Sequence, residues 1–385
     1  MRRLLLPLLL LFALSAFSAD PLVVFFIDPT AFEYSGDAMV VCTPGGRHFV
    51  IDGGMLAGFQ PQWDCGAQRV LPLLDSLDVT YLEGVVGTHP DADHIGGLIS
   101  VYQELPVATA YDSGWPYSGT YTYEQYLLAI QNSGADYVIP RRGDMLDWGP
   151  ELQVEVIHPV EPLSPSSSNN ASLVLRLTYD EVSFLFTGDL ETNGGEDVVL
   201  AALSSGVIDD ISADVLKVGH HGSASSTCTQ WLARVDPEIA AICVGAGNPY
   251  GHPHDEVVSR IQGRGITIHR TDLDGTFYIS SDGQDVYYNT MPPDTGITAP
   301  VGEIAVYPSP AVSEATFAWD TDDGNECRIM VYNLAGECVL NAQGNGGSYA
   351  SDLSTDGGLA SPGLYAAVFK PEGGGSFTEY FTVSR

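Results

Sequence analysis

Four potential metal ligands lie within six residues of this sequence, directly after an apolar run that is typical of a β-strand. They are His89, Asp91, Asp93 and His94. Imidazole and carboxylate groups suit Zn²⁺ and Mn²⁺, and side chains at the strand ends of α/β sheets commonly face a ligand. The spacing indicates a metal centre in which His89 and Asp91 face one metal position and Asp93 and His94 face a second.

Further strand-like runs end in residues of the same kind. They are Asp189 after SFLFTG, His220 and His221 after DVLKVG, and His252 and His254 in GNPYGHPH. A lone aspartate at a strand end is usually a helix cap, but several such ends together favour one joint metal centre. Asp52, in VIDGGM, is either a turn former or a residue that orients the metal loop.

Alternating strand and helix patterns from about residue 21 to residue 285 predict a layered α/β domain. The pair Gly45-Gly46 between β-branched runs predicts a hairpin, and Gly134 is expected to end the helix that precedes it. Residues 289–301 are rich in Pro, Thr and Gly and are typical of a linker. Short strand-like runs in residues 302–385 predict a small all-β sandwich.

The charge balance limits the partners of the chain. Its 385 residues carry 15 Lys and Arg against 49 Asp and Glu, a formal net charge of −34. Phosphate recognition in duplex nucleic acid normally depends on clustered basic side chains. The composition therefore argues against tight, unspecific binding of long DNA. With 44% hydrophobic residues, the chain has enough apolar side chains to fold, which excludes a disordered acidic tail.

Residues 1–19 have the pattern of a signal peptide, with a charged start, an apolar run and small residues up to Ala19. This run is shorter than the ~20 apolar residues of a membrane span, and no later segment is long enough. We therefore expect an exported protein that is periplasmic, on the cell surface or extracellular. Export permits disulfides. Cys327 and Cys338 are the best candidate pair, with two buried free thiols as the alternative.

The motifs, taken in order, resemble those of the metallo-β-lactamase superfamily, and more narrowly the periplasmic hydrolase domain of ComEC-type competence proteins. The stretches that carry the resemblance are Gly36-Asp-Ala38, Asp52-Gly-Gly54, His89-Pro-Asp-Ala-Asp-His-Ile-Gly-Gly97, Asn169-Asn-Ala-Ser172, Thr187-Gly-Asp189, His220-His-Gly-Ser223, Val244-Gly-Ala-Gly-Asn-Pro-Tyr-Gly-His-Pro-His254 and Arg270-Thr-Asp-Leu-Asp-Gly275. No stretch resembles the membrane channel of that group, so the resemblance implies a stand-alone secreted relative.

The resemblance implies an αββα sandwich in residues 20–288 with two divalent metal ions, Zn²⁺ or Mn²⁺, at one edge. By matching positions, His89 and Asp91 would hold the first ion, Asp93, His94 and His220 the second, and Asp189 would bridge the two.

Two positions depart from the superfamily pattern. Asp91 stands where the commonest motif has a second histidine, as in the ComEC-type group, and a harder carboxylate ligand favours Mn²⁺. Asn169 and Asn170 stand where a third-motif histidine is usual, and His158 lies nearby in the sequence. The sequence leaves open whether one of these residues completes the first site or a single ion is bound.

The implied reaction is hydrolysis of a phosphodiester by a metal-activated hydroxide, in a nuclease or a phosphodiesterase acting on a small molecule. The catalytic residues would be Asp93, with His221 and Ser223 binding the scissile phosphate and His252 or His254 protonating the leaving group. For each of the last four residues, a purely structural role is an equally good interpretation. The same fold also supports hydrolysis of lactone, thioester or β-lactam substrates. Outside the enzymes, the competing hypothesis is a non-catalytic surface protein with a structural metal.

The tail, residues 302–385, resembles the C-terminal sorting domains of type IX secretion, and FlgD-type immunoglobulin-like modules share much of its pattern. The matching stretches are Val306-Tyr-Pro-Ser-Pro310, Val331-Tyr-Asn-Leu-Ala-Gly336 and Leu359-Ala-Ser-Pro-Gly-Leu-Tyr365. The first interpretation implies contact with outer-membrane secretion machinery and cleavage or surface attachment. The second implies a passive immunoglobulin-like sandwich.

Overall fold

The computed structural model describes residues 21–29, 36–57, 63–115, 120–163 and 166–289, and seven strand segments between residues 304 and 383. The expected signal peptide, residues 1–19, and all but the first residue of the expected linker lie outside the described residues. Within the part that is described, no helix is both long enough and apolar enough to span a bilayer.

Residues 21–289 form two mixed β-sheets with a shared apolar core between them. The first sheet runs in the order β17 (Val286–Tyr288), β16 (Phe277–Ser281), β1 (Leu22–Phe26), β2 (Ala38–Cys42), β3 (His48–Gly53), β6 (Leu82–Gly87), β7 (Val107–Asp112) and β8 (Asp136–Val138). The second runs in the order β15 (Thr267–Arg270), β14 (Ile239–Ile242), β13 (Val215–Lys217), β12 (Val182–Phe186), β11 (Val174–Tyr179), β10 (Leu152–His158) and β9 (Met145–Leu146).

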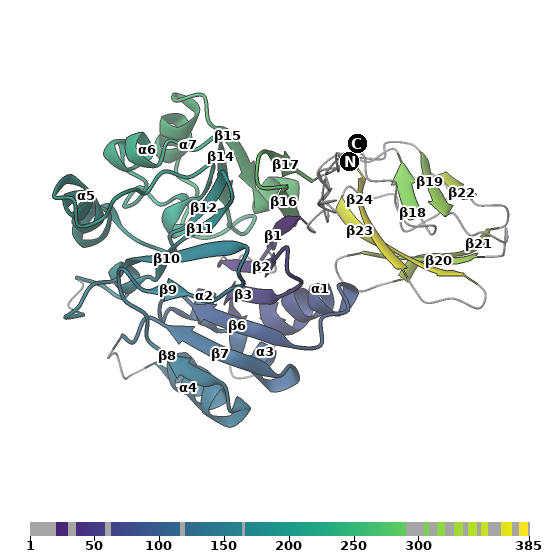
Figure 1. Ribbon diagram of the computed structural model, residues 1–385, viewed down its shortest axis with the longest axis horizontal. Helices are drawn as coiled ribbons and strands as arrows, with labels where there is room; N and C mark the ends of the chain where they lie inside the picture. Colours follow the sequence, from purple (N-terminus) through teal and green to yellow (C-terminus); the bar gives the residue numbers. More distant parts are fainter. Residues whose placement is uncertain are drawn as a thin grey trace, which may run out of the picture.

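Helices cover the outer faces of both sheets (Figure 1). α1 (Leu71–Ser76), α3 (Leu98–Glu104) and α4 (Tyr121–Ser133) pack on the first sheet, and α5 (Asp197–Ser204), α6 (Thr229–Val235) and α7 (Asp255–Gln262) pack on the second. Side chains alternate between the faces of a strand: Val85 packs against the first helical layer, whereas Val86 packs between the sheets. The four layers confirm the predicted αββα sandwich.

Local signals in the sequence are confirmed at two turns. Gly45 and Gly46 lie in the turn between the paired strands β2 and β3. Gly134 follows α4 in the left-handed conformation, with φ of 77°. Glycine adopts this conformation with little steric strain because it has no Cβ atom.

The remaining short elements are β4 (Leu56–Ala57), β5 (Trp63–Asp64), α2 (Ala92–Ile95), α8 (Thr271–Asp274) and the turns η1 (Gly66–Val70), η2 (Asn169–Ala171), η3 (Thr192–Glu196) and η4 (Gly219–Gly222).

The tail forms two antiparallel sheets, which confirms the all-β prediction for this part of the chain. One sheet contains β18 (Ile304–Tyr307), β19 (Glu314–Trp319) and β22 (Ser348–Asp352). The other runs in the order β21 (Cys338–Gly344), β20 (Cys327–Asn333), β23 (Gly363–Pro371) and β24 (Phe377–Val383).

The predicted disulfide between Cys327 and Cys338 is wrong. The register of β20 and β21 pairs Cys327 with Gly344 and Cys338 with Tyr332, so the two cysteines lie near opposite ends of the ladder. Five residues along a strand span about 16 Å, whereas a disulfide needs Cα atoms within about 7 Å. Consecutive strands were visible in the sequence, but their register was not. Cys42, Cys65, Cys228 and Cys243 are free thiols.

Candidate metal centre

Strand ends from both sheets meet at one edge of the sandwich. In the first sheet, β3, β6 and β7 run parallel, and in the second sheet β12, β13 and β14 do so, so the carboxyl ends within each set lie side by side. The residues that follow these ends are His89, Asp91, Asp93 and His94 after β6, Asp189 after β12, and His220 and His221 after β13.

Asp189 lies at the centre of the residues brought together. Its Oδ1 atom lies 3.3 Å from Nε2 of His94. Its Oδ2 atom lies 3.5 Å from Nε2 of His221, 3.7 Å from Nε2 of His220 and 3.9 Å from Nε2 of His89. One carboxylate is therefore shared by histidines from separate strand ends, as the sequence predicted for a joint centre.

The two aspartates of the metal loop lie beside different histidines of the cluster. Asp91 Oδ2 lies 3.7 Å from Nε2 of His89, and Asp93 Oδ2 lies 3.4 Å from Nε2 of His221. Asp91 and Asp93 therefore contact different histidines, and their division between two metal positions stays a prediction.

Each of the four histidines is oriented through its Nδ1 atom. Nδ1 of His94 lies 2.8 Å from Oδ2 of Asp52, and Nδ1 of His221 lies 2.9 Å from the Cys243 carbonyl oxygen. Nδ1 of His89 lies 3.1 Å from Oγ1 of Thr88, and Nδ1 of His220 lies 3.1 Å from Oγ of Ser225. Metal-binding histidines characteristically use the second ring nitrogen in this way. The Nε2 atoms remain directed into the cluster.

Several of these polar atoms are buried without a hydrogen-bond partner, namely Nε2 of His89, His94 and His221 and Oδ1 of Asp189. Each unsatisfied buried polar atom costs ~1–3 kcal/mol, and native proteins rarely leave several together. Imidazole nitrogens and carboxylate oxygens are the donor set of Zn²⁺ and Mn²⁺. The cluster therefore fits a bound divalent cation.

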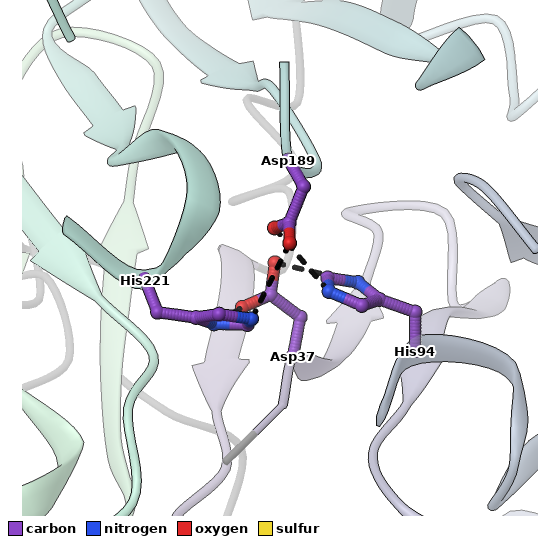
Figure 2. A group of neighbouring side chains, drawn as sticks. All are labelled: Asp37, His94, Asp189 and His221. Carbon is purple, nitrogen blue, oxygen red and sulfur yellow. Dashed lines mark ion pairs between the residues drawn. The ribbon is translucent and has the colours of Figure 1, made fainter. Parts of the chain in front are cut away.

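One group of four side chains is close enough to hold an ion by itself. Asp37, His94, Asp189 and His221 each offer a ligand atom, and these atoms lie within 4.8 Å of one another. Figure 2 shows the four side chains pointing toward one another from separate segments of the chain.

Opposite charges hold the cluster together. Burial by itself would raise the pKa of Asp189, but the three imidazoles of His221, His94 and His220 outweigh it and hold the pKa of that carboxyl well below its usual range. Burial by itself would lower the pKa of His94, but Asp189 and Asp52 raise it well above its usual value. Metal ligation requires a neutral imidazole, so an entering cation would release protons from these rings.

The paired histidines after β13 are arranged differently from the prediction. The sequence placed His220 with Asp93 and His94, and His221 with the substrate; in the structure it is His221 that contacts Asp93. Both residues have positive φ, 48° for His220 and 52° for His221. This left-handed turn brings both imidazoles to Asp189, and the order of the residues alone did not show which one would face Asp93.

Two of the three residues considered for the first site, Asn170 and His158, have partners elsewhere. Asn170 is buried; its Oδ1 accepts the Glu191 N–H at 3.1 Å and its Nδ2 donates to the Asn193 carbonyl at 3.0 Å. His158 Nε2 donates to the Asn170 carbonyl at 2.9 Å. Asn169 Oδ1 is buried without a partner. His220 and His89 both approach Oδ2 of Asp189, at 3.7 Å and 3.9 Å.

The other predicted catalytic residues surround the histidine pair. Ser223 is buried and its Oγ lies 3.1 Å from Oγ of Ser225, within the turn. The ring centroid of His252 lies 5.6 Å from that of His220 and 4.9 Å from that of His254. These positions put Ser223, His252 and His254 at the cluster without assigning them a reaction step.

Asp52 orients the metal loop, one of the two roles left open by the sequence. It is fully buried, and it accepts hydrogen bonds from the Thr88 N–H at 2.8 Å and from Thr88 Oγ1 at 2.7 Å, in addition to His94. It also has a positive φ of 56° although it lies inside β3.

Sequence reasoning missed two residues of the cluster, Asp37 and Lys217. Both side chains are fully buried and form an ion pair. Gly36 lets Asp37 approach, because a Cβ at Gly36 would collide with the Asp93 carbonyl. The sequence did contain one signal for Lys217. It is one of two lysines in the chain and lies inside the apolar run VLKV, where a charged side chain is expected to be buried and paired.

Comparisons with known proteins agree with this architecture. The family model described as the metallo-beta-lactamase superfamily matches residues 32–246. ComE operon protein 3 of Bacillus subtilis is 32% identical over 268 residues, which are 67% of this chain and 33% of that protein. Competence protein ComA of Neisseria gonorrhoeae is 30% identical over 246 residues, which are 64% of this chain and 31% of that protein. The chain thus spans about a third of the length of these relatives.

Among solved structures, CmlA, a diiron beta-hydroxylase from Streptomyces venezuelae, is 13% identical, with a TM-score of 0.42 over 68% of this chain and 54% of that one. The family match extends over more than half of the chain and includes the whole metal loop and Asp189. The chain belongs to the metallo-β-lactamase superfamily.

Proposed function

We propose that the protein is an exported phosphodiesterase that cleaves small phosphodiesters with two divalent ions, Zn²⁺ or Mn²⁺. His89, Asp91 and His220 hold one ion, Asp93, His94 and His221 hold the other, and Asp189 bridges them. Ions bound there would supply Lewis-acid chemistry, since they lower the pKa of water toward neutrality and offset negative charge on phosphate oxygens.

The observation that carries the proposal is the set of unpartnered Nε2 atoms around Asp189. Charge supports two ions rather than one. The carboxylates in or against the cluster are those of Asp37, Asp52, Asp91, Asp93, Asp189 and Glu191, and Lys217 is the one ammonium among the described residues there. With neutral imidazoles, a net charge of −5 remains, and two divalent cations offset most of it.

His254 is the residue best placed to protonate a leaving group. The Ala224 N–H donates to Nδ1 of His254 at 2.9 Å, so the neutral ring carries its proton on Nε2, where it can be donated. Burial together with the neighbouring His221 and His220 lowers the pKa of His252 to about 4, so His252 remains uncharged at neutral pH. We therefore assign proton donation to His254 and contact with the scissile phosphate to Ser223 and His252.

The charged surface favours a small substrate over a nucleic acid. Five arginines of the domain are paired with carboxylates, namely Arg47 with Asp147, Arg141 with Glu161, Arg176 with Asp210, Arg264 with Asp236 and Arg270 with Asp272. Binding along a phosphate backbone needs free cationic side chains. With five of the nine arginines in residues 21–289 paired in this way, we expect the metal centre to supply most of the attraction for phosphate, which suits a substrate with one or two phosphates.

The test uses the full chain, measured for bound metal and for turnover of bis-p-nitrophenyl phosphate, single-stranded DNA and nitrocefin. We expect bound Zn²⁺ or Mn²⁺ and hydrolysis of the small diester, with both lost in Asp189→Ala and His94→Ala. Arg176→Met, outside the cluster, serves as the control. A protein without metal, or variants equal to the wild type, would refute the proposal. Nitrocefin turnover alone would instead assign β-lactam hydrolysis, and bound metal without any turnover would assign a binding protein.

Export is a separate part of the proposal, and it rests on the composition of residues 1–19. The mature N-terminus, determined by mass spectrometry after expression with cell fractionation, should begin near residue 20 in the exported fraction. We further propose that the tail, residues 302–385, contacts the secretion machinery of the outer membrane. Deleting the tail should then leave the protein in the periplasm; unchanged release would favour a passive module.

A further inference from the structure

A lysine is buried inside the cluster that we propose as a metal centre. Lys217, at the end of β13, has no exposed side-chain surface. Its Nζ atom donates to the Gly188 carbonyl at 3.0 Å, forms the ion pair with Asp37 and lies 3.9 Å from Oδ1 of Asp189. A buried ammonium is costly unless it is paired, so this lysine is held in place by its acidic partner.

Asp37 is close enough to the cluster to be a metal ligand. Its carboxylate belongs to the group of four whose ligand atoms lie within 4.8 Å of one another. Its Oδ1 atom lies 3.2 Å from Nδ1 of His221, and its Oδ2 atom lies 3.8 Å from Nδ1 of His94. Asp37 therefore has two competing uses, as a ligand of an ion or as the partner of Lys217 and of these two rings.

We propose that Lys217 keeps Asp37 out of the ligand shell of the ion held by His94 and His221, and so leaves a ligand position open for substrate. Catalytic metal sites keep such a position, whereas structural sites are closed by protein ligands. The positive charge of Lys217 pairs with the Asp37 carboxylate and would repel a cation that approached it. Asp37 then stays on the Nδ1 side of His221 and His94, at 3.2 Å and 3.8 Å. This inference rests on the metal centre proposed above.

Replacing Lys217 with methionine, which is similar in length and uncharged, frees Asp37 to bind the ion. We expect Lys217→Met to bind Zn²⁺ and Mn²⁺ more tightly than the wild type, on the order of 100-fold, because one repelling charge is lost and one ligand is gained. Asp37→Asn leaves the lysine charge unpaired and should weaken binding by a similar factor. The double variant Asp37→Asn/Lys217→Met should return close to the wild type.

The measurements are calorimetric titration of the metal-free full chain with Zn²⁺ and Mn²⁺, and the visible absorption spectrum of the Co²⁺-loaded protein, which reports the number and type of ligands. The spectrum should change in Lys217→Met and revert in the double variant. If Lys217→Met does not fold, the double variant is compared with Asp37→Asn and should bind metal more tightly. Arg176→Met/Asp210→Asn removes an ion pair outside the centre and serves as the control.

A merely structural pair would give a different result, because Lys217→Met and Asp37→Asn would then both weaken metal binding. That result, or a Lys217→Met spectrum equal to the wild type, would overturn the inference while leaving the metal centre intact. Absence of metal from the wild-type protein would overturn the metal centre and this inference together.

Discussion

Replacing Asp52 with asparagine tests how much the metal centre depends on a residue that orients a ligand. Asp52 Oδ2 accepts hydrogen bonds from His94 Nδ1 at 2.8 Å and from Thr88 Oγ1 at 2.7 Å, and Oδ1 accepts the Thr88 N–H at 2.8 Å. Asparagine has one acceptor oxygen and one amide donor. Whichever way it is placed, the amide faces an N–H group of either His94 or Thr88.

The expected magnitude follows from these contacts. A hydrogen bond to a charged group contributes ~1.5–3 kcal/mol, and a buried N–H left without an acceptor costs ~1–3 kcal/mol. We therefore expect the free energy of unfolding of the metal-free protein to fall by about 3 kcal/mol. Loss of the group that orients a metal-binding histidine typically lowers metal affinity ~10–100-fold, and we expect this range for Asp52→Asn.

The assay combines chelator competition for metal affinity with urea unfolding of the metal-free protein. Asp64→Asn is the matched control, because Asp64 is also buried and accepts from the Ala67 N–H at 3.0 Å and from Ser100 Oγ at 2.5 Å, outside the cluster. The control should lose stability and keep its metal affinity. If Asp52→Asn also kept its metal affinity, the orienting role assigned to Asp52 would be refuted.

Three further predictions concern the histidine pair, acid stability and the segment just before α6. His220→Ala should leave one ion bound per chain by elemental analysis, and retention of both ions would contradict the assignment. Burial lowers the pKa of His158 to about 4. Below about pH 6.5 this histidine therefore binds a proton in the unfolded chain but stays neutral in the folded protein. The free energy of unfolding should consequently fall by about 3 kcal/mol between pH 6.5 and pH 4. His158→Gln should lack this loss in urea unfolding at the two pH values. Glu196 is buried and accepts the N–H groups of Thr227 and Cys228, so Glu196→Ala should lower the free energy of unfolding by ~2–5 kcal/mol, and an unchanged urea midpoint would count against this role.

Much of the fold followed from local patterns. Consecutive apolar residues occur in β6 and β12 because strands of this sandwich are covered on both faces: Val85 and Leu185 contact the helical layers, while Val86 and Phe184 contact the opposite sheet. The order of the strands across each sheet was not visible, since it depends on which strands pair over long distances. The failed prediction for the cysteines of the tail has the same cause.

The sequence by itself determined which strand ends carry metal-binding residues, because His89 to His94, Asp189 and the pair His220-His221 are each contiguous with the strand that delivers them. Only the tertiary structure decided which histidine lies beside which aspartate. The choice between the paired histidines depends on left-handed backbone angles at a turn.

The partners of the ligands depend on the packing of one sheet against the other. Asp37 precedes β2 in the first sheet, and Lys217 ends β13 in the second; they form an ion pair only because the sheets face each other at this edge. A periodic pattern records which side of a strand is buried, but it does not record which residue of a distant strand lies opposite. The types of the candidate ligands could therefore be predicted from the sequence, whereas the position of the Lys217 ammonium beside Asp37 depends on the tertiary fold.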